Sequence, residues 1–119
     1  MTSSQEHEQD IARLFRQRGL DAKVQPGSGN RDYNPNDVRS NDADLMIECK
    51  VTEKRSMTFQ LSWIERVKDK SMTFFKRGVV AMRFKLPWPA KPKDYIIIDF
   101  NFFMHLLECE RQVGKCVCQ

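Results

Sequence analysis

The chain has 119 residues, enough for one modest hydrophobic core and too few for two. Hydrophobic residues make up 40% of it and charged residues 30%, an ordinary balance for a globular protein. It contains no run of about 18 apolar residues, and its first ten residues are polar and acidic, so the sequence predicts neither a membrane span nor a signal peptide. We therefore expect an intracellular, cytoplasmic protein whose four cysteines are thiols.

Charge is distributed unevenly along the chain. Residues 1–49 contain 6 basic residues (Lys or Arg) and 9 acidic ones (Asp or Glu), a net charge of −3. Residues 50–94 contain 12 basic and 4 acidic residues (net +8), and residues 95–119 contain 2 and 3 (net −1). A basic patch beside an acidic cluster suits a metal-dependent enzyme acting on a polyanion, because carboxylates hold the cation and basic side chains hold the phosphates. The alternative is that these charges form ordinary solvated faces.

Residue patterns predict eight regular elements, in the order helix, strand, strand, strand, helix, strand, strand, helix. The expected ranges are helices over 3–19, 58–76 and 100–110, and strands over 21–25, 37–39, 44–52, 79–84 and 95–99. Ser3 and Glu6 have capping-box spacing at the start of the first helix. Thr58 can cap the second helix, and Gly78 can end it. The order is that of an α/β fold, so we expect one domain with a small mixed central β-sheet flanked by helices.

Two loops and the first and last helices contain further residues with a possible structural or functional role. Residues 26–36 are rich in Gly, Pro and Asn and predict a loop, and loops of this length are often functional. In the basic loop 85–93 (KLPWPAKPK), Trp88 either contacts nucleic acid or pins the loop to the core, and we favour the core. His7 is expected to be solvated on the first helix. Asp99 can cap the last helix, whose aromatic residues we expect mostly in the core.

The strand expected over 44–52 contains a charged pair within an apolar run, in the segment IECKVT. Side chains alternate along a strand, so one face should be core and the other should present Glu48 and Lys50 together. An acid and a lysine at this spacing are most often a simple ion pair. The core set is Leu45, Ile47, Cys49 and Val51, and the opposite set is Met46, Glu48, Lys50 and Thr52.

Three residues upstream could join Glu48 and Lys50 in one site. They are Glu8 on the first helix, Ser28 in the loop and Asp37 directly after the loop. Mg²⁺ takes oxygen ligands and is usually held by one or two carboxylates with substrate phosphate, so Asp37, Glu48 and the backbone carbonyl of Cys49 could hold it. Lys50 could then orient the attacking water or neutralise charge at phosphorus, which suits hydrolysis of a phosphodiester.

These segments resemble the PD-(D/E)xK nuclease superfamily, and within it the archaeal and phage Holliday junction resolvases. The shared features are a Glu followed eleven residues later by Gly on an N-terminal helix, a GS loop, an Asp at the start of a strand, and I-E-x-K with a Thr two places on. The matching segments are EQDIARLFRQRG at 8–19, GSG at 27–29, NDVR at 36–39 and IECKVT at 47–52. The resemblance covers roughly residues 3–58, and Asn36 departs from it by standing where the superfamily has proline.

The resemblance implies a restriction-endonuclease-like core and a metal-dependent endodeoxyribonuclease of DNA recombination and repair. Asp37 and Glu48 would be metal ligands and Lys50 the catalytic lysine. Glu8 would be an additional acid near the metal, and Ser28 part of the catalytic loop. The cofactor would be Mg²⁺, for which Mn²⁺ could substitute. The substrate would be branched DNA such as a Holliday junction, whose near two-fold symmetry a homodimer would match.

Basic residues outside the motifs are candidates for contacts with the DNA backbone, which bind without reading sequence. They are Arg31, Arg39, Lys54, Arg55, Lys68, Lys70, Lys76 and Arg77. On the last helix, Phe102, Phe103 and Leu106 could form a dimer interface or pack in the core.

Several alternatives stay open at this level. Asp42 and Asp44 are rival carboxylates, and Asp44 would share the strand face of Glu48 if the preceding turn is tight, but we prefer Asp37 because it follows the GSG loop. A nuclease of the same fold could nick or degrade ordinary duplex DNA, and a non-catalytic module could simply bind junctions. A zinc site is a further option, but the residue spacing matches no familiar zinc motif. Its candidate ligands are His105, Cys109, Cys116 and Cys118.

Overall fold

The fold is built on one mixed β-sheet with helices against both of its faces. The computed structural model describes residues 2–25 and 37–117, with the backbone alone for Asp37 and residues 114–117. The expected site residues Ser28 and Arg31 lie outside this part of the chain. None of the described helices combines the length and the apolar character needed to cross a membrane.

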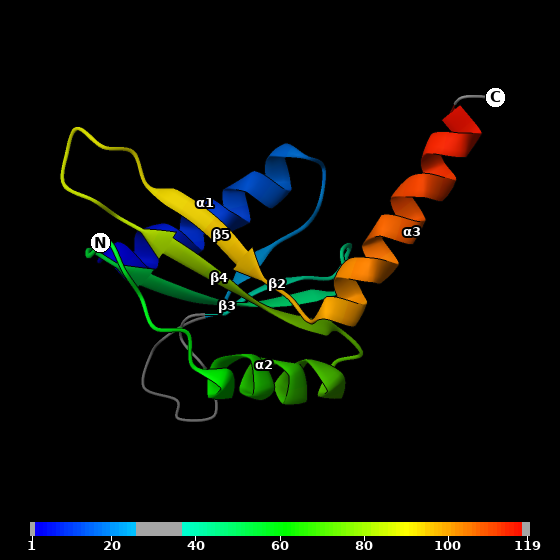
Figure 1. Ribbon diagram of the computed structural model, residues 1–119, viewed down its shortest axis with the longest axis horizontal. Helices are drawn as coiled ribbons and strands as arrows, with labels where there is room; N and C mark the ends of the chain where they lie inside the picture. The colour runs from blue at the N-terminus through cyan, green and yellow to red at the C-terminus, as the bar shows by residue number, and fades with distance from the viewer. Residues whose placement is uncertain (1, 26–36, 118–119) are drawn as a thin grey trace.

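Five strands form the sheet, in the order β1-β2-β3-β4-β5. They are β1 (Lys23–Val24), β2 (Asp37–Ser40), β3 (Leu45–Thr52), β4 (Arg77–Phe84) and β5 (Lys93–Ile97). Strands β3 and β4 are parallel, and the other neighbours are antiparallel. Parallel neighbours need a crossover, which α2 (Leu61–Thr73) provides. Helix α1 (Ser3–Gln17) covers one face and α2 the other (Figure 1). The expected α/β class with a mixed sheet is confirmed.

The N-terminal cap of α1 differs from the predicted one. The Thr2 hydroxyl accepts a 3.2 Å hydrogen bond from the backbone N–H of Gln5, whose side chain accepts one of 2.8 Å from the backbone N–H of Thr2. The capping box is therefore Thr2 with Gln5 rather than Ser3 with Glu6, because the same spacing recurs one residue earlier. Gly19 follows the helix with φ +79°, a conformation that favours glycine.

Strand β3 is buried from both sides. On the α1 side, Ile47 and Cys49 pack with residues of α1, β2 and β4, and on the α2 side Met46 packs with Val67 of the crossover helix. Glu48 also faces α2 and is fully buried. The prediction that only one face of this strand is core is wrong, because a crossover helix between two parallel neighbours has to pack over them.

Helix α2 is shorter than predicted, and its ends differ. Gln60 rather than Thr58 occupies the N-cap position, and no side chain caps it. Gly78 does not end the helix but lies in β4, where an added Cβ would come within 2.6 Å of the carbonyl carbon and oxygen of Val67. Close packing of α2 on the sheet therefore depends on glycine at this position.

Helix α3 (Phe100–Val117) extends past its predicted end at residue 110 and projects away from the sheet (Figure 1). Asp99 accepts a 3.1 Å hydrogen bond from the backbone N–H of Asn101, as expected of a cap. Phe102 packs against the core, but Phe100 and Phe103 are 72% and 43% exposed. The expectation that these aromatic residues mostly serve the core is wrong, because the helix leaves the body of the protein after its first turn.

Candidate active site

Glu48 stands at the centre of the predicted site. It lies in the middle of β3, and none of its side chain is exposed. Its register partner in the antiparallel β2–β3 pair is Asp37. Directly opposite residues in such a pair have Cα atoms about 4.5–5.5 Å apart. The backbone therefore brings these two positions side by side, although the side chain of Asp37 lies outside the described part.

Two cations compensate the buried carboxylate of Glu48. Its Oε1 accepts a 2.7 Å hydrogen bond from Nη2 of Arg66, and Nζ of Lys50 lies 3.7 Å from the same oxygen. A buried carboxylate without such partners would be costly, so both cations stabilise the side chain in this position. The sequence patterns do not single out Arg66. The signal that could find it is the parallel pairing of β3 and β4, which sends the connecting helix over the Glu48 face.

Lys50 occupies the same face of β3 and is partly open to solvent, with 22% of its side chain exposed. Its Nζ lies 5.0 Å from the centre of the Trp63 ring, and Phe59 packs edge-on against Trp63 with ring centres 5.9 Å apart. A cation near the face of an indole is attracted to it. The aromatic pair at the start of α2 therefore helps to hold the ammonium group between Glu48 and the solvent.

Two other residues of the predicted site come from the opposite face of the sheet. Glu8 is 5% exposed on α1, the helix that packs on the side away from α2. Cys49 directs its side chain into the α1-side core and is 4% exposed. The side chain of Cys49 therefore does not face Glu48, and a role of its backbone carbonyl as a ligand stays a prediction.

The rival carboxylates Asp42 and Asp44 lie in the turn between β2 and β3. Asp42 accepts a 2.9 Å hydrogen bond from the backbone N–H of Asp21 and donates one of 2.6 Å from its own N–H to the Asp21 carboxylate. The N–H of Asp42 is the main group that lowers the pKa of Asp21. Asp44 has φ +53° and precedes the strand, so strand alternation does not carry its side chain to the Glu48 face. This geometry favours the position of Asp37 over that of Asp44.

A second charged cluster joins α1 to β4 and β5. Arg83 is 5% exposed and donates to both carboxylate oxygens of Asp94, at 2.7 and 2.8 Å, and to Asp10 at 2.7 Å. His7 is fully buried, with Nε2 3.7 Å from Asp94, so the expectation that it is solvated is wrong. Burial, followed by the charge of Arg83, lowers the pKa of His7 to about 4. Hydrogen bonds from Arg83 lower the pKa of Asp94.

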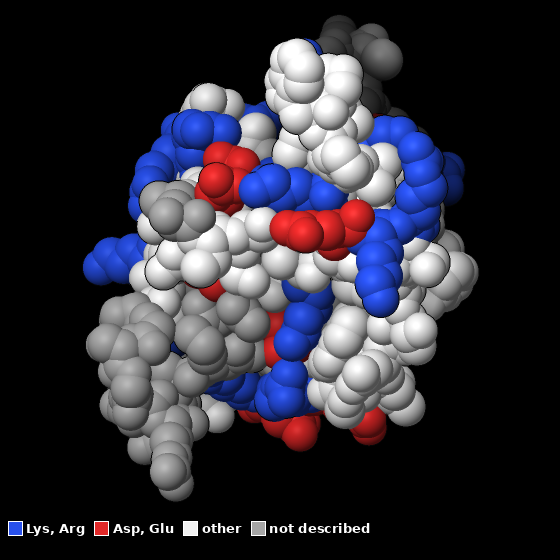
Figure 2. Space-filling model, turned by 90° about the vertical axis from the view of Figure 1, so that its left-hand side faces the viewer, with Lys and Arg blue, Asp and Glu red and all other residues white. Residues whose placement is uncertain are grey.

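Four of the predicted DNA-contacting residues fall into two groups. Lys54 and Arg55 are exposed in the turn after β3 and form no ion pair with a described residue. By contrast, the guanidinium of Arg39 stacks 4.1 Å from the centre of an aromatic ring, and Lys68 lies 3.4 Å from Asp99. Figure 2 views the end of the molecule where β3 stops, and Lys and Arg side chains lie on several sides of this face with acidic groups between them.

The described zinc candidates are neighbours on α3, where Sγ of Cys109 lies 3.6 Å from Nε2 of His105. Among the side chains that the structure describes, no group of three or more His, Cys, Asp or Glu is arranged to hold a metal ion. The side chains of Cys116, Cys118 and Asp37 fall outside that set. The predicted Mg²⁺ site therefore stays a prediction, and the zinc option stays open.

Comparison of the sequence with known proteins assigns no family: no protein-family model matches it, and no significant match occurs among curated proteins. Any functional conclusion therefore depends on the residues and the geometry of the site.

Proposed function

We propose that this protein is a metal-dependent endodeoxyribonuclease of the PD-(D/E)xK type, with a restriction-endonuclease-like core, that cleaves branched DNA such as a Holliday junction. One observation carries the proposal: Glu48 has Lys50 3.7 Å from its carboxylate on one side and Asp37 as its register partner on the other. A simple ion pair would need no second acid beside it. Two acids and a lysine at one point of a sheet suit phosphodiester hydrolysis.

The donor set fits a hard divalent cation such as Mg²⁺ or Mn²⁺. Carboxylates at Asp37 and Glu48 are the oxygen ligands that such ions prefer, and ligands must be deprotonated to bind. A bound cation would take over the compensation of Glu48 from Arg66, whose side chain is 55% exposed and would then turn towards solvent. When bound, the metal would supply electrophilic polarisation of the phosphate and activation of water.

The remaining steps fall to residues of the chain itself. Lys50 lies between the buried Glu48 and the solvent, where it would meet the incoming phosphate and neutralise charge developing on phosphorus. Trp63 keeps that ammonium group in place. Water adds to phosphorus, one ester P–O bond breaks, and the leaving oxygen takes up a proton. The products are a phosphate monoester end and a hydroxyl end.

The substrate preference is tested by cleavage of a four-way junction and of a linear duplex of the same sequence, both with Mg²⁺. We expect the junction to be cut faster. Equal rates on both would contradict the junction preference and would identify a nuclease of ordinary duplex DNA. Because phosphate contacts carry no sequence information, changing the arm sequences should alter the junction rate little.

We further propose that the protein forms a homodimer through α3 and the edge strand β5, because these two elements leave large apolar side chains in solvent. Eight such side chains are between 37% and 72% exposed: Tyr95, Ile96, Phe100, Phe103, Met104, Leu106, Leu107 and Val113. A standard interface needs about 800 Å² per partner. These eight side chains together expose several hundred Å², since one large aromatic residue has about 150–250 Å². The radius of gyration, 15.4 Å, also exceeds the ~13.5 Å of a compact domain of this length.

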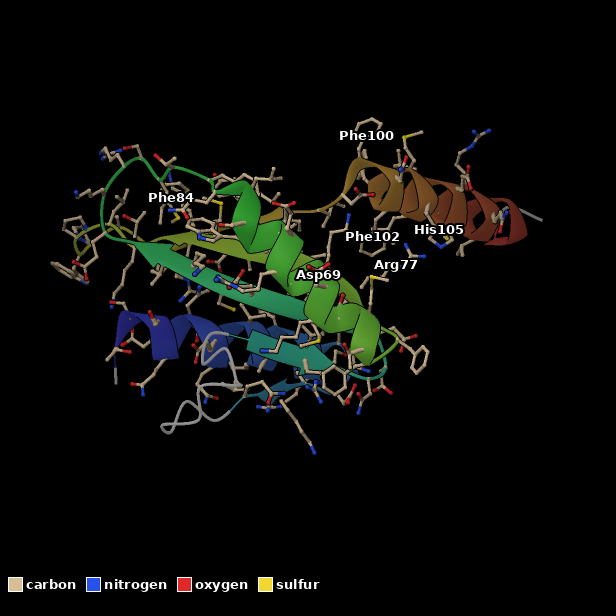
Figure 3. The ribbon with its side chains drawn as sticks, turned by 90° about the horizontal axis from the view of Figure 1, so that it is seen from below. Asp69, Arg77, Phe84, Phe100, Phe102 and His105 are labelled. Atoms are coloured by element: carbon tan, nitrogen blue, oxygen red, sulfur yellow. The ribbon has the colours of Figure 1, made fainter. Side chains whose placement is uncertain are left out.

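A groove beside α3 provides the complementary surface. Its volume is about 470 Å³, and its apolar walls are Leu45, Val79, Ile96, Ile98, Phe102 and Leu106. Figure 3 shows that Phe102 and His105 point from α3 towards Arg77, whereas Phe100 points away into solvent. The guanidinium of Arg77 lies 4.4 Å from the centre of the Phe102 ring, so the start of α3 is anchored. In the proposed dimer, the rest of α3 would pack against a second copy.

Light scattering after gel filtration tests the dimer at micromolar concentration. We expect a dimer for the wild type and a monomer for Phe103→Asp, because a buried charge would oppose association. The matched control is Phe75→Asp, which changes a residue that is 93% exposed outside α3 and β5 and should leave the dimer intact. A monomeric wild type, or a dimeric Phe103→Asp variant, would contradict the proposed interface.

A non-catalytic junction-binding module is the second candidate. It is favoured by the complete burial of Glu48 and by its existing pairing with Arg66 and Lys50. Such a module would bind junctions and give no product with Mg²⁺ or Mn²⁺, and Asp37→Asn would not change its behaviour.

A further inference from the structure

The connection between β4 and β5, residues 85–92, displays an aromatic side chain at the surface. Trp88 is 92% exposed, so the expectation that it pins this loop to the core is wrong. Pro87 and Pro89 flank it, and proline restricts the backbone on either side. A single exposed tryptophan is not informative by itself. Its neighbours decide what it could bind.

Exposed basic residues lie in the same connection and at its base. Lys91 and Lys93 follow Trp88, and Arg55 lies in the turn after β3; all three are exposed and none forms an ion pair with a described residue. Lys85, at the base of the connection, instead binds Glu6 at 2.8 Å. Exposed cations in the same region as an exposed aromatic side chain favour an anionic, ring-containing ligand over an apolar one.

A shallow pocket lies at the base of the same connection. Its volume is about 210 Å³, and it is lined by Arg55, Phe84, Leu86, Lys93 and Tyr95. The rings of Phe84 and Tyr95 pack edge to face with centres 6.2 Å apart, and Tyr95 is 60% exposed. A lining that combines two aromatic rings with two cations matches the chemistry of a nucleotide, which has a flat base and a phosphate.

The sheet register relates this pocket to the candidate active site. Lys50 pairs with Met82, which in turn pairs with Tyr95, so all three lie in one row across β3, β4 and β5. Two strand spacings put the Cα atoms of Lys50 and Tyr95 about 10 Å apart. Figure 3 places Phe84 far from Arg77, at the other end of the sheet. One DNA strand could therefore contact Lys50 and the pocket together.

We propose that residues 85–92 and this pocket form a nucleotide-binding contact that selects DNA with an unpaired or unstacked base. Trp88 stacks on the base, while Arg55 and Lys93 hold adjacent phosphates. In a continuous duplex, neighbouring base pairs cover both faces of each base, so Trp88 finds a stacking partner only at a branch point, a nick or a single strand. The inference rests on the proposed function and deepens it by naming the feature of the DNA that is recognised.

Binding of fluorescently labelled DNA, measured by anisotropy in a chelator, tests this contact without cleavage. The ligands are a single strand, a four-way junction and a linear duplex. We expect Trp88→Ala to weaken binding of the single strand and the junction by about 5- to 150-fold, the range for loss of one base–aromatic stack. Duplex binding should change by less than about twofold, because its bases offer no free face. Trp88→Phe should stay within about threefold of the wild type, since phenylalanine also stacks.

The matched control is Phe75→Ala, which removes an aromatic residue that is 93% exposed and that we place in no binding surface. It should bind all three ligands like the wild type. The contact is overturned if Trp88→Ala behaves like Phe75→Ala, as it would if this surface served a protein partner, or if Trp88→Ala loses affinity equally for duplex and single strand. If the wild type cleaves DNA in Mg²⁺ but Trp88→Ala binds DNA like the wild type, this inference fails and the nuclease proposal stands. If Trp88→Ala weakens binding as expected but the wild type gives no cleavage in Mg²⁺, the nuclease proposal fails and the nucleotide-binding contact stands.

Discussion

Replacement of Arg66 by methionine tests how the protein tolerates its buried Glu48. Arg66 donates a 2.7 Å hydrogen bond to a carboxylate that is fully buried, and Lys50 would remain 3.7 Å away. Removing one partner of a fully buried ion pair costs about 3–5 kcal/mol. Arg66 is 55% exposed and Lys50 stays in place, so solvent screening reduces that cost. We expect Arg66→Met to lower the free energy of unfolding by about 2 kcal/mol.

Urea unfolding at pH 7 in the presence of a chelator measures this loss. The matched control is Arg13→Met, because Arg13 is 63% exposed and pairs with Asp10 at 2.8 Å on the surface of α1. Arg13→Met should lower the free energy of unfolding by less than about 0.5 kcal/mol. Adding Glu48→Gln to Arg66→Met should restore most of the stability, since no buried charge then lacks compensation. Equal losses for the two methionine variants, or a double variant as unstable as Arg66→Met, would refute this reasoning.

Three further predictions concern packing, pH and metal. Gly78→Ala should lower the free energy of unfolding by about 3 kcal/mol in thermal unfolding, because the new Cβ would overlap the Val67 backbone. Gly19→Ala should lower it by about 1 kcal/mol, because no atom lies within 4 Å of the new Cβ and only φ is unfavourable. Equal losses would contradict the close packing at Gly78. His7 has a folded pKa of about 4 against 6.5 when unfolded, so the unfolded chain binds the proton first. Stability should therefore fall by up to about 3 kcal/mol as pH drops from 7 towards 4, and His7→Phe should flatten this dependence; an unchanged slope would contradict it. Mg²⁺ at 100 times its Kd should stabilise the wild type by about 2.7 kcal/mol and Glu48→Gln much less, and equal shifts would argue against Glu48 as a ligand.

Local sequence patterns predicted what depends on near neighbours in the chain. The alternation in IECKVT correctly put Glu48 and Lys50 on one face of β3, and the first helix ends at Gln17, two residues before the predicted end at Gly19. The order of helices and strands gave the α/β class with a mixed sheet. The pairing of Asp37 with Glu48 is consistent with the motif order but needed the strand register to establish it.

Features that depend on distant contacts were not predictable in the same way. Arg66 reaches Glu48 only because α2 crosses over that face of the sheet, and its spacing from Glu48 matches no motif. The burial of His7 depends on Arg83 and Asp94, which lie on strands far along the chain. The aromatic residues of α3 resembled a core pattern in the sequence because amphipathic periodicity does not show whether the apolar face of a helix packs within its own chain.

The most direct test of the nuclease proposal is product formation from a labelled four-way junction by the wild type and by Glu48→Gln, each with Mg²⁺ and with a chelator. Glu48→Gln keeps the shape of the side chain and removes the charge that would hold the metal. We predict product only for the wild type with Mg²⁺, while Glu48→Gln still binds the junction. Product formation by Glu48→Gln at the wild-type rate, or by the wild type in chelator, would contradict the nuclease proposal. The absence of product from the wild type with both Mg²⁺ and Mn²⁺ would also contradict it.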